Sequence, residues 1–189
     1  WDHVWRDPLR LPTSPAMKAA MAFWWASIAL RAVGIEWARV PTDLLLAILA
    51  SGVLVGFAEE LLFRGLFLRG MRAGGRSEAA AAIGTAAAFG LFHLPNVFMG
   101  TGAIGLVQIV LAGVSGLVLY AFRRHHGTLW PAMLAHGSWD ISTFLAGGYA
   151  RPWLGELTLW MLLGSLVLAI GVLVSIVRQD RHRVALPQA

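Results

Sequence analysis

The sequence predicts an all-α fold, a polytopic membrane helical bundle with about six transmembrane helices. Only 13% of its 189 residues are charged and 58% are hydrophobic, whereas a soluble domain carries about 25% charged residues. The apolar residues also form runs of about twenty residues, the length at which a helix crosses the hydrocarbon core of a bilayer. These runs span residues 17–37, 42–68, 78–98, 103–122, 128–148 and 156–177.

Residues that favour helix ends separate these runs. Pro41, Thr42 and Asp43 precede the second run, and Ser77 with Glu78 precedes the third; these residue types are common at helix starts. Glycine- and proline-containing turns separate the remaining runs. Because no internal repeat or linker is visible, we expect a single domain over residues 1–189, with the functional motifs inside 42–148.

Basic residues predict the orientation of the bundle. With six crossings, four arginine-containing clusters fall on one side of the membrane, and the positive-inside rule makes that side cytoplasmic. Both termini are therefore predicted to be cytoplasmic. The clusters are Arg6, Arg10 and Lys18; Arg69, Arg72 and Arg76; Arg123 and Arg124; and Arg178, Arg181 and Arg183.

Composition also bears on location and partners. The alanine- and arginine-rich composition favours a bacterial inner-membrane protein, and the net charge of +5 comes from short clusters between apolar runs. This pattern reflects membrane topology, so we expect the lipid bilayer as a partner and no nucleic acid. The absence of cysteine excludes disulfides and a cysteine nucleophile.

Tryptophans near the ends of the runs are predicted to anchor the helices at the membrane interfaces. They are Trp24, Trp25, Trp37, Trp130, Trp153 and Trp160.

Ionisable residues inside the apolar runs are the strongest functional signal. Each costs a few kcal/mol on insertion scales, so it is expected to face the bundle interior and to serve a function. Three predicted helices carry such residues: Glu59, Glu60 and Arg64; His93; and His136 with Asp140.

The spacing in the second run separates the two glutamates. Glu60 and Arg64 are four residues apart with the acid first, the favoured order for a helical ion pair. Neighbouring helical residues point about 100° apart, so Glu59 remains as a free carboxylate. A carboxylate removed from water is a better proton acceptor near neutral pH, which makes Glu59 a candidate base. The alternative is an interhelical ion-pair cluster without chemistry.

Histidines supply the second half of the candidate site. His136 and Asp140 are four residues apart and share a helical face, so the carboxylate could orient the imidazole, or both could contact one bound species. Taken alone, His93 or the His136–Asp140 pair could be hydrogen-bonded packing residues. A packing role does not require three helices to carry such groups, so their joint occurrence favours a site.

Three motifs in order, Glu59-Glu60-x-x-x-Arg64, Phe89-x-x-x-His93 and His136-x-x-x-Asp140, resemble the CAAX prenyl protease and bacteriocin-processing family of intramembrane proteases. The resemblance implies a helical membrane fold with its site in a cavity open to one side. It implies that Glu59 and His93 activate water for attack on a peptide carbonyl.

The same resemblance implies that Glu60 and Arg64 support the site, while His136 and the residue at 140 stabilise the oxyanion. The substrate would be a membrane-associated protein or peptide.

Position 140 departs from the eukaryotic members, which typically have Asn there. An ionised aspartate only accepts hydrogen bonds, so Asp140 is protonated, orients His136 or helps to hold a cation. A glutamate mechanism needs no cofactor. The alternative is zinc, for which Glu59, His93, His136 and Asp140 offer nitrogen and oxygen ligands. Two other functions stay open: a non-catalytic membrane immunity or scaffold protein, and a proton-coupled transporter.

Overall fold

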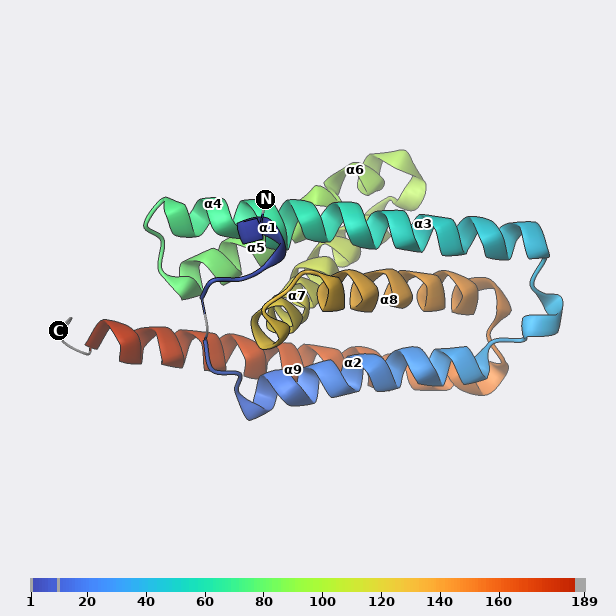
Figure 1. Cartoon of the computed structure of the whole chain (residues 1–189). Coiled ribbons are helices and arrows are strands. Elements are labelled where there is room, and N and C mark those ends of the chain that lie inside the picture. Colours follow the sequence, from blue (N-terminus) through green and yellow to red (C-terminus); the bar gives the residue numbers. More distant parts are fainter. Residues whose placement is uncertain (1, 10, 186–189) are drawn as a thin grey trace.

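The computed structural model describes residues 2–9 and 11–185, and within them the predicted all-α fold is confirmed. No strand occurs among these residues, which contain two isolated β-bridges, Arg6 with Thr128 and Ile35 with Ala150. The main helices are α2 (Pro15–Gly34), α3 (Thr42–Glu60), α5 (Glu78–Phe92), α7 (Ala103–His126), α8 (Trp130–Tyr149) and α9 (Pro152–Ala185) (Figure 1). Shorter elements are α1 (Asp2–Trp5), η1 (Trp37–Arg39), α4 (Leu68–Ala73) and α6 (Leu94–Asn96).

Two π-helical segments modify the predicted runs. The segment η2 (Leu61–Phe67) joins α3 to α4, so that one rod runs from Thr42 to Ala73, beyond the predicted end at 68. The segment η3 (Val97–Thr101) follows α6. Because the first rod is longer than predicted, Glu59 and His93 lie a similar number of residues from the 74–77 turn between α4 and α5.

Within the described residues, four helical stretches are long and apolar enough to cross a membrane: Thr42–Ala73, Glu78–Thr101, Ala103–His126 and Pro152–His182. The predicted count of six is therefore not established. The other two predicted crossings correspond to α2 and α8, each 20 residues long. Length alone would suffice for both, but polar residues such as Lys18 and Arg31 in α2, and His136 and Asp140 in α8, lower their hydropathy.

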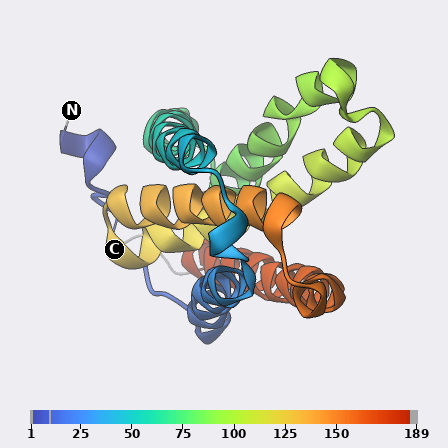
Figure 2. The same ribbon diagram turned by 90° about the vertical axis from the view of Figure 1, so that its right-hand side faces the viewer.

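The bundle is arranged around α8. In Figure 1, α3 lies on one side of α8, and α2 and α9 lie on the other. Figure 2 shows the green and yellow hairpin of α5, α6 and α7 projecting away from the remaining helices at its tip. Exposed apolar side chains cover this tip, including Phe98, Met99 and Ile104, which suits contact with lipid.

Glycines allow α3 and α8 to approach closely. A Cβ atom on Gly56 would lie 2.7 Å from the Met133 carbonyl oxygen, and one on Gly137 would lie 2.5 Å from the Gly52 carbonyl oxygen. Both distances are shorter than a real Cβ contact, so the two backbones touch where other residues would hold them apart. Small residues of this kind let helices pack tightly in membranes. This contact brings Glu59 and Glu60 beside His136.

The basic clusters gather toward one end of the bundle. Figure 1 shows α4, the end of α7 and the C-terminal part of α9 toward the same end as the N-terminal segment. Arg10 and the side chain of Arg183 lie outside the described residues. The common end agrees with the predicted topology, but the cytoplasmic orientation itself stays a prediction.

Arg123 and Arg124 differ from the prediction that they lie between helices. Both are in the last turns of α7 and are buried. Arg123 donates to the carbonyls of Trp5 and Val4, so it fixes the N-terminal segment rather than facing water. The helix ends at His126 and is capped by Gly127, whose φ of 68° is left-handed and whose N–H donates to the Arg123 carbonyl.

Candidate active site

Glu60 is the centre of the polar cluster between α3 and α8. Its Oε1 atom accepts a hydrogen bond from Arg64 Nη1 at 2.6 Å, which confirms the predicted ion pair. The same oxygen lies 2.9 Å from Nδ1 of His136. Arg64 also donates to the Gly116 carbonyl at 3.1 Å and lies over the Phe89 ring. The ion pair therefore connects α3, α7 and α8 inside the bundle.

The backbone that carries this pair changes helical type at the site. Glu59 and Glu60 are the last residues of α3, and Arg64 lies within the π-helical segment η2. Segments of this kind inside α-helices are frequent at functional sites. Glu60 and Arg64 are 0% and 1% exposed, so neither charge has water as an alternative partner.

His136 presents its other ring nitrogen to two carboxylates. Nε2 lies 3.9 Å from Oε2 of Glu59 and 3.6 Å from Oδ2 of Asp140. Both distances are too long for a direct hydrogen bond. Nε2 is thus available to a third group between these carboxylates, while Glu60 orients the ring through Nδ1.

Glu59 has the free carboxylate expected from its sequence position. Its Oε2 atom is buried and has no hydrogen-bond partner, although the side chain as a whole is 17% exposed. Besides His136, it lies within electrostatic range of His93 and Asp140. The site thus combines a carboxylate free to accept a proton with two imidazoles.

His93 enters the site from the end of α5. Its Nδ1 lies 2.9 Å from the Phe89 carbonyl oxygen, and a carbonyl only accepts, so Nδ1 carries the proton. In the neutral ring Nε2 is then an acceptor. His93 and His136 both pack edge-on against Phe89, which places the two imidazoles against one aromatic ring.

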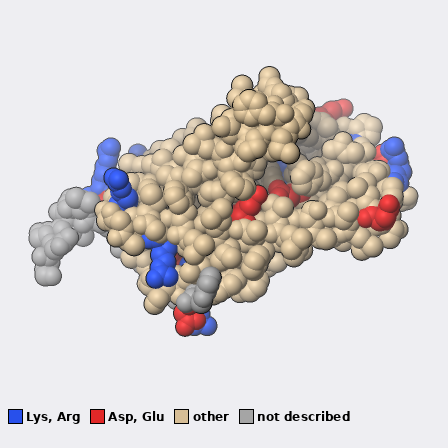
Figure 3. Space-filling model, turned by 90° about the horizontal axis from the view of Figure 1, so that it is seen from above, with Lys and Arg blue, Asp and Glu red and all other residues tan. Residues whose placement is uncertain are grey.

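A cavity of about 410 Å³ adjoins these groups. His93, His136 and Asp140 line it together with residues of α7 and α9, including Gln108 and Ser165. Gln108, which has no evident partner in the sequence, accepts a hydrogen bond from Asn96. Figure 3 shows acidic side chains at the middle of one face beside a hollow, whereas lysine and arginine side chains lie mostly toward the ends. A chain segment could therefore reach the polar cluster from outside.

A catalytic zinc ion would need three protein ligands arranged around one point. Among the described residues, no group of three or more histidine, cysteine or acidic side chains is placed so that it could hold one metal ion. In this arrangement the zinc alternative has no support from the ligand geometry of the described residues.

The prediction did not include three residues that line the cavity: Trp24, Arg31 and Trp139. Trp24 is 3% exposed, donates to the Ala135 carbonyl and stacks on Trp139, so its predicted interfacial position is wrong. Arg31 lies over the Trp139 ring and lines the cavity. The position of Arg31 inside the apolar run 17–37 is the sequence signal that points to it.

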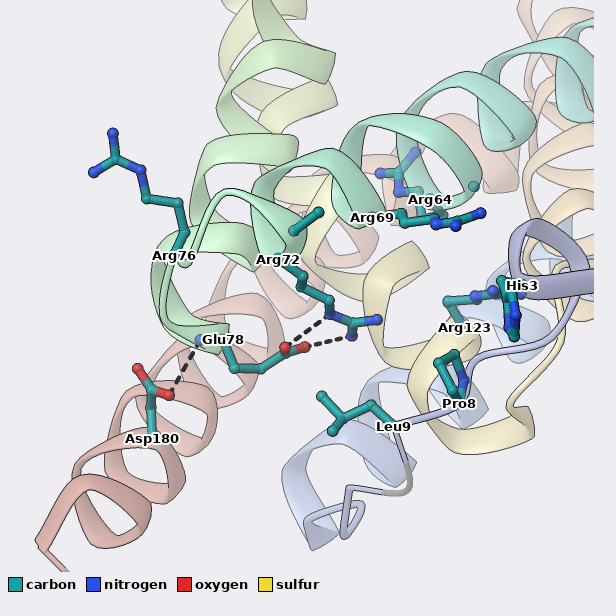
Figure 4. A pocket seen from close by; sticks show the side chains of 12 residues that line it. His3, Pro8, Leu9, Arg64, Arg69, Arg72, Arg76, Glu78, Arg123 and Asp180 are labelled. Carbon is teal, nitrogen blue, oxygen red and sulfur yellow. Dashed lines mark hydrogen bonds and ion pairs between the residues drawn. The ribbon is translucent and has the colours of Figure 1, made fainter. Parts of the chain in front are cut away.

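A second cavity, of about 620 Å³, lies at the basic end of the bundle. Arg64, Arg72, Arg76 and Arg123 are among the residues that line it, and Figure 4 shows the Arg76 guanidinium directed away from the other three. Arg72 bonds both Asp7 and Glu78, and the backbone N–H of Glu78 bonds Asp180. These contacts join the N-terminal segment, α4, α5 and α9 at one end of the bundle.

One comparison with known proteins gave a match. A family model described as type II CAAX prenyl endopeptidase Rce1-like matches residues 41–142, more than half of the chain. Comparisons with curated proteins and with solved structures gave no match. The matched range contains the polar cluster of α3 and α8 and the end of α5.

Proposed function

Because the chain belongs to the type II CAAX prenyl endopeptidase Rce1-like family, we propose that it is an intramembrane endopeptidase in which Glu59 and His93 activate a water molecule. The observation that carries this mechanism is the carboxylate of Glu59, which has a buried oxygen without a hydrogen-bond partner and lies near two imidazoles. The activity cuts a peptide bond of a membrane-associated protein or peptide.

Water is activated by proton transfer to the Glu59 carboxylate. Nε2 of His93 accepts a hydrogen bond from the same water and orients it. The water oxygen bonds to the peptide carbonyl carbon, and the electrons of the C=O double bond move onto its oxygen. When this intermediate collapses, the C–N bond breaks and Glu59 returns its proton to the leaving amine.

His136 stabilises the oxyanion through Nε2. The geometry supports this role because Nδ1 is held by Glu60 while Nε2 faces the space between Glu59 and Asp140. With Glu60 beside it, His136 can carry a proton on both nitrogens and donate from Nε2. Arg64 and Glu60 hold the ring in position, and Asp140 orients it from the opposite side.

The test is cleavage of a panel of membrane-active peptides by the purified protein in detergent, with products identified by mass spectrometry. The panel includes prenylated and unprenylated peptides, so that the experiment reports whether cleavage requires a lipid on the substrate. Glu59→Gln removes the base while nearly preserving shape, and His93→Ala removes the water-orienting imidazole. Each should lower kcat by at least about 100-fold, as expected for loss of a general base.

Glu36→Gln is the matched control, because Glu36 lies in the loop between α2 and α3 and its side chain pairs, among the described residues, only with Arg39. This variant should cleave like wild type. Cleavage that is lost with a chelator and restored by zinc would overturn the glutamate mechanism. Cleavage by Glu59→Gln at the wild-type rate would overturn it as well. If neither protein forms any product, the result would favour a binding role of the immunity or scaffold type.

A further inference from the structure

Arg31 extends from α2 into the cavity beside the proposed catalytic groups. It lies one turn before the end of α2 at Gly34, and helical side chains lean toward the N-terminus of their helix. The side chain therefore runs toward the middle of the bundle, not toward the nearer end. Its guanidinium carbon lies 4.0 Å from the centre of the Trp139 ring, and the residue lines the cavity with His93, His136 and Asp140.

Two tryptophans hold this guanidinium in place. Trp139 stacks on Trp24 with ring centres 4.1 Å apart. Trp24 is buried, and its indole nitrogen donates to the Ala135 carbonyl at 2.9 Å. Arg31 thus rests on an aromatic surface that is itself fixed to α8, so its charge keeps a defined position in the cavity.

Arg31 has no anionic partner in the described part of the chain. Its Nη1 atom is buried without a hydrogen-bond acceptor. A cation–π contact offsets only part of the cost of a guanidinium inside a membrane protein. An anion that enters the cavity would supply the missing partner.

We propose that Arg31 binds a carboxylate of the substrate peptide, at a position in the cavity apart from the bond that is cut. The guanidinium fork matches the planar geometry of a carboxylate and binds it through two parallel hydrogen bonds. The carboxylate is either the free C-terminus of the peptide or an aspartate or glutamate side chain. Arg31 enters the cavity from α2, whereas His93 enters it from the end of α5 and His136 from α8, so we assign this contact to a part of the peptide other than the scissile carbonyl.

This inference rests on the proposed function, so its test separates binding from cleavage. The probes are fluorophore-labelled octapeptides of alanine and leucine, measured by anisotropy with the full-length Glu59→Gln protein. One pair ends in a carboxylate or a carboxamide. A second pair ends in a carboxamide and carries one internal Asp or Asn. At least one carboxylate peptide should bind about 10-fold more tightly than its amide partner, as a charged hydrogen bond requires.

Arg31→Met in the same background should abolish this preference, and Arg31→Lys should keep part of it, because lysine retains the charge without the fork. Arg151→Met is the matched control: Arg151 is an exposed arginine at the same end of the bundle and does not line the cavity. It should leave the preference unchanged. Gel filtration and thermal unfolding verify that each variant is folded.

Equal binding of acid and amide peptides would overturn the proposal, and so would a preference that survives undiminished in the Arg31→Met variant. The same peptides are then offered to the wild-type protein. Arg31-dependent binding without cleavage would overturn the endopeptidase mechanism alone. Cleavage of acid and amide peptides at the same rate would overturn the role of Arg31 alone.

Discussion

Nδ1 of His136 lies 2.9 Å from the same carboxylate oxygen of Glu60 that accepts a hydrogen bond from Arg64. One buried oxygen thus connects an imidazole of α8 to a guanidinium of the neighbouring rod. Because this carboxylate has no contact with water, its two partners depend on it for their position and for the compensation of their charge. The stability and the activity of the protein should both respond to changes here.

Arg64→Met should destabilise the protein by about 3–5 kcal/mol, because it leaves the Glu60 carboxylate buried opposite a methionine. Thermal unfolding in detergent measures this change. The matched variant is Arg39→Met, which breaks an ion pair whose arginine is 63% exposed. Loss of such a surface pair costs no more than about 1 kcal/mol. Equal effects of the two substitutions would contradict a structural role of the buried pair.

His136→Gln should lower kcat by about 100- to 1,000-fold, the usual effect of removing one oxyanion donor. KM should change little, because the interaction forms only in the transition state. Steady-state kinetics on a peptide cleaved by the wild type separates the two constants. His125→Gln is the control, since His125 is exposed and its ring contacts Thr13 and His126. A raised KM with unchanged kcat would assign His136 to substrate binding instead.

Gly56→Ala should destabilise the protein by about 1–3 kcal/mol, the range for overpacking a tight interior. The added Cβ would lie 2.7 Å from the Met133 carbonyl oxygen and 2.8 Å from the Gly137 nitrogen, so α3 and α8 must separate. Activity should fall with stability, because the same contact places Glu59 beside His136. Gly147→Ala, with nothing within 4 Å of its new Cβ, should unfold at the wild-type temperature or above it. If both variants are as stable as wild type, the close approach of the two helices is wrong.

Arg72→Met should release the N-terminal segment. Arg72 contacts both carboxylate oxygens of Asp7 at 3.0 Å and is bonded to Glu78 from the other side. Without it, the amides of residues 2–9 should exchange hydrogen about 10-fold faster or more, in line with the loss of a charge-assisted bond. Hydrogen exchange followed by mass spectrometry reports this segment directly. Arg76→Met should leave the exchange unchanged, since the Arg76 guanidinium is directed away from Arg72 and Glu78 (Figure 4). An effect of equal size there would contradict the role of Arg72.

Local spacing was enough to predict part of the site. Residues four apart on a helix share a face whatever the helix packs against, which is why the Glu60–Arg64 ion pair and the proximity of His136 to Asp140 could be predicted. The all-α fold was predictable for a similar reason, because long uncharged apolar runs leave the backbone no other way to satisfy its hydrogen bonds in lipid.

Contacts between helices required the folded chain. The hydrogen bond from His136 to Glu60 depends on how α3 and α8 meet, and that register is set by backbone contacts at Gly52, Gly56 and Gly137. Trp24 illustrates the same limit: its residue type favours a membrane interface, but packing against Trp139 buries it beneath Arg31. Helical periodicity specifies neighbours along one helix, whereas the partner across an interface depends on the shapes of two surfaces that only the assembled bundle brings together.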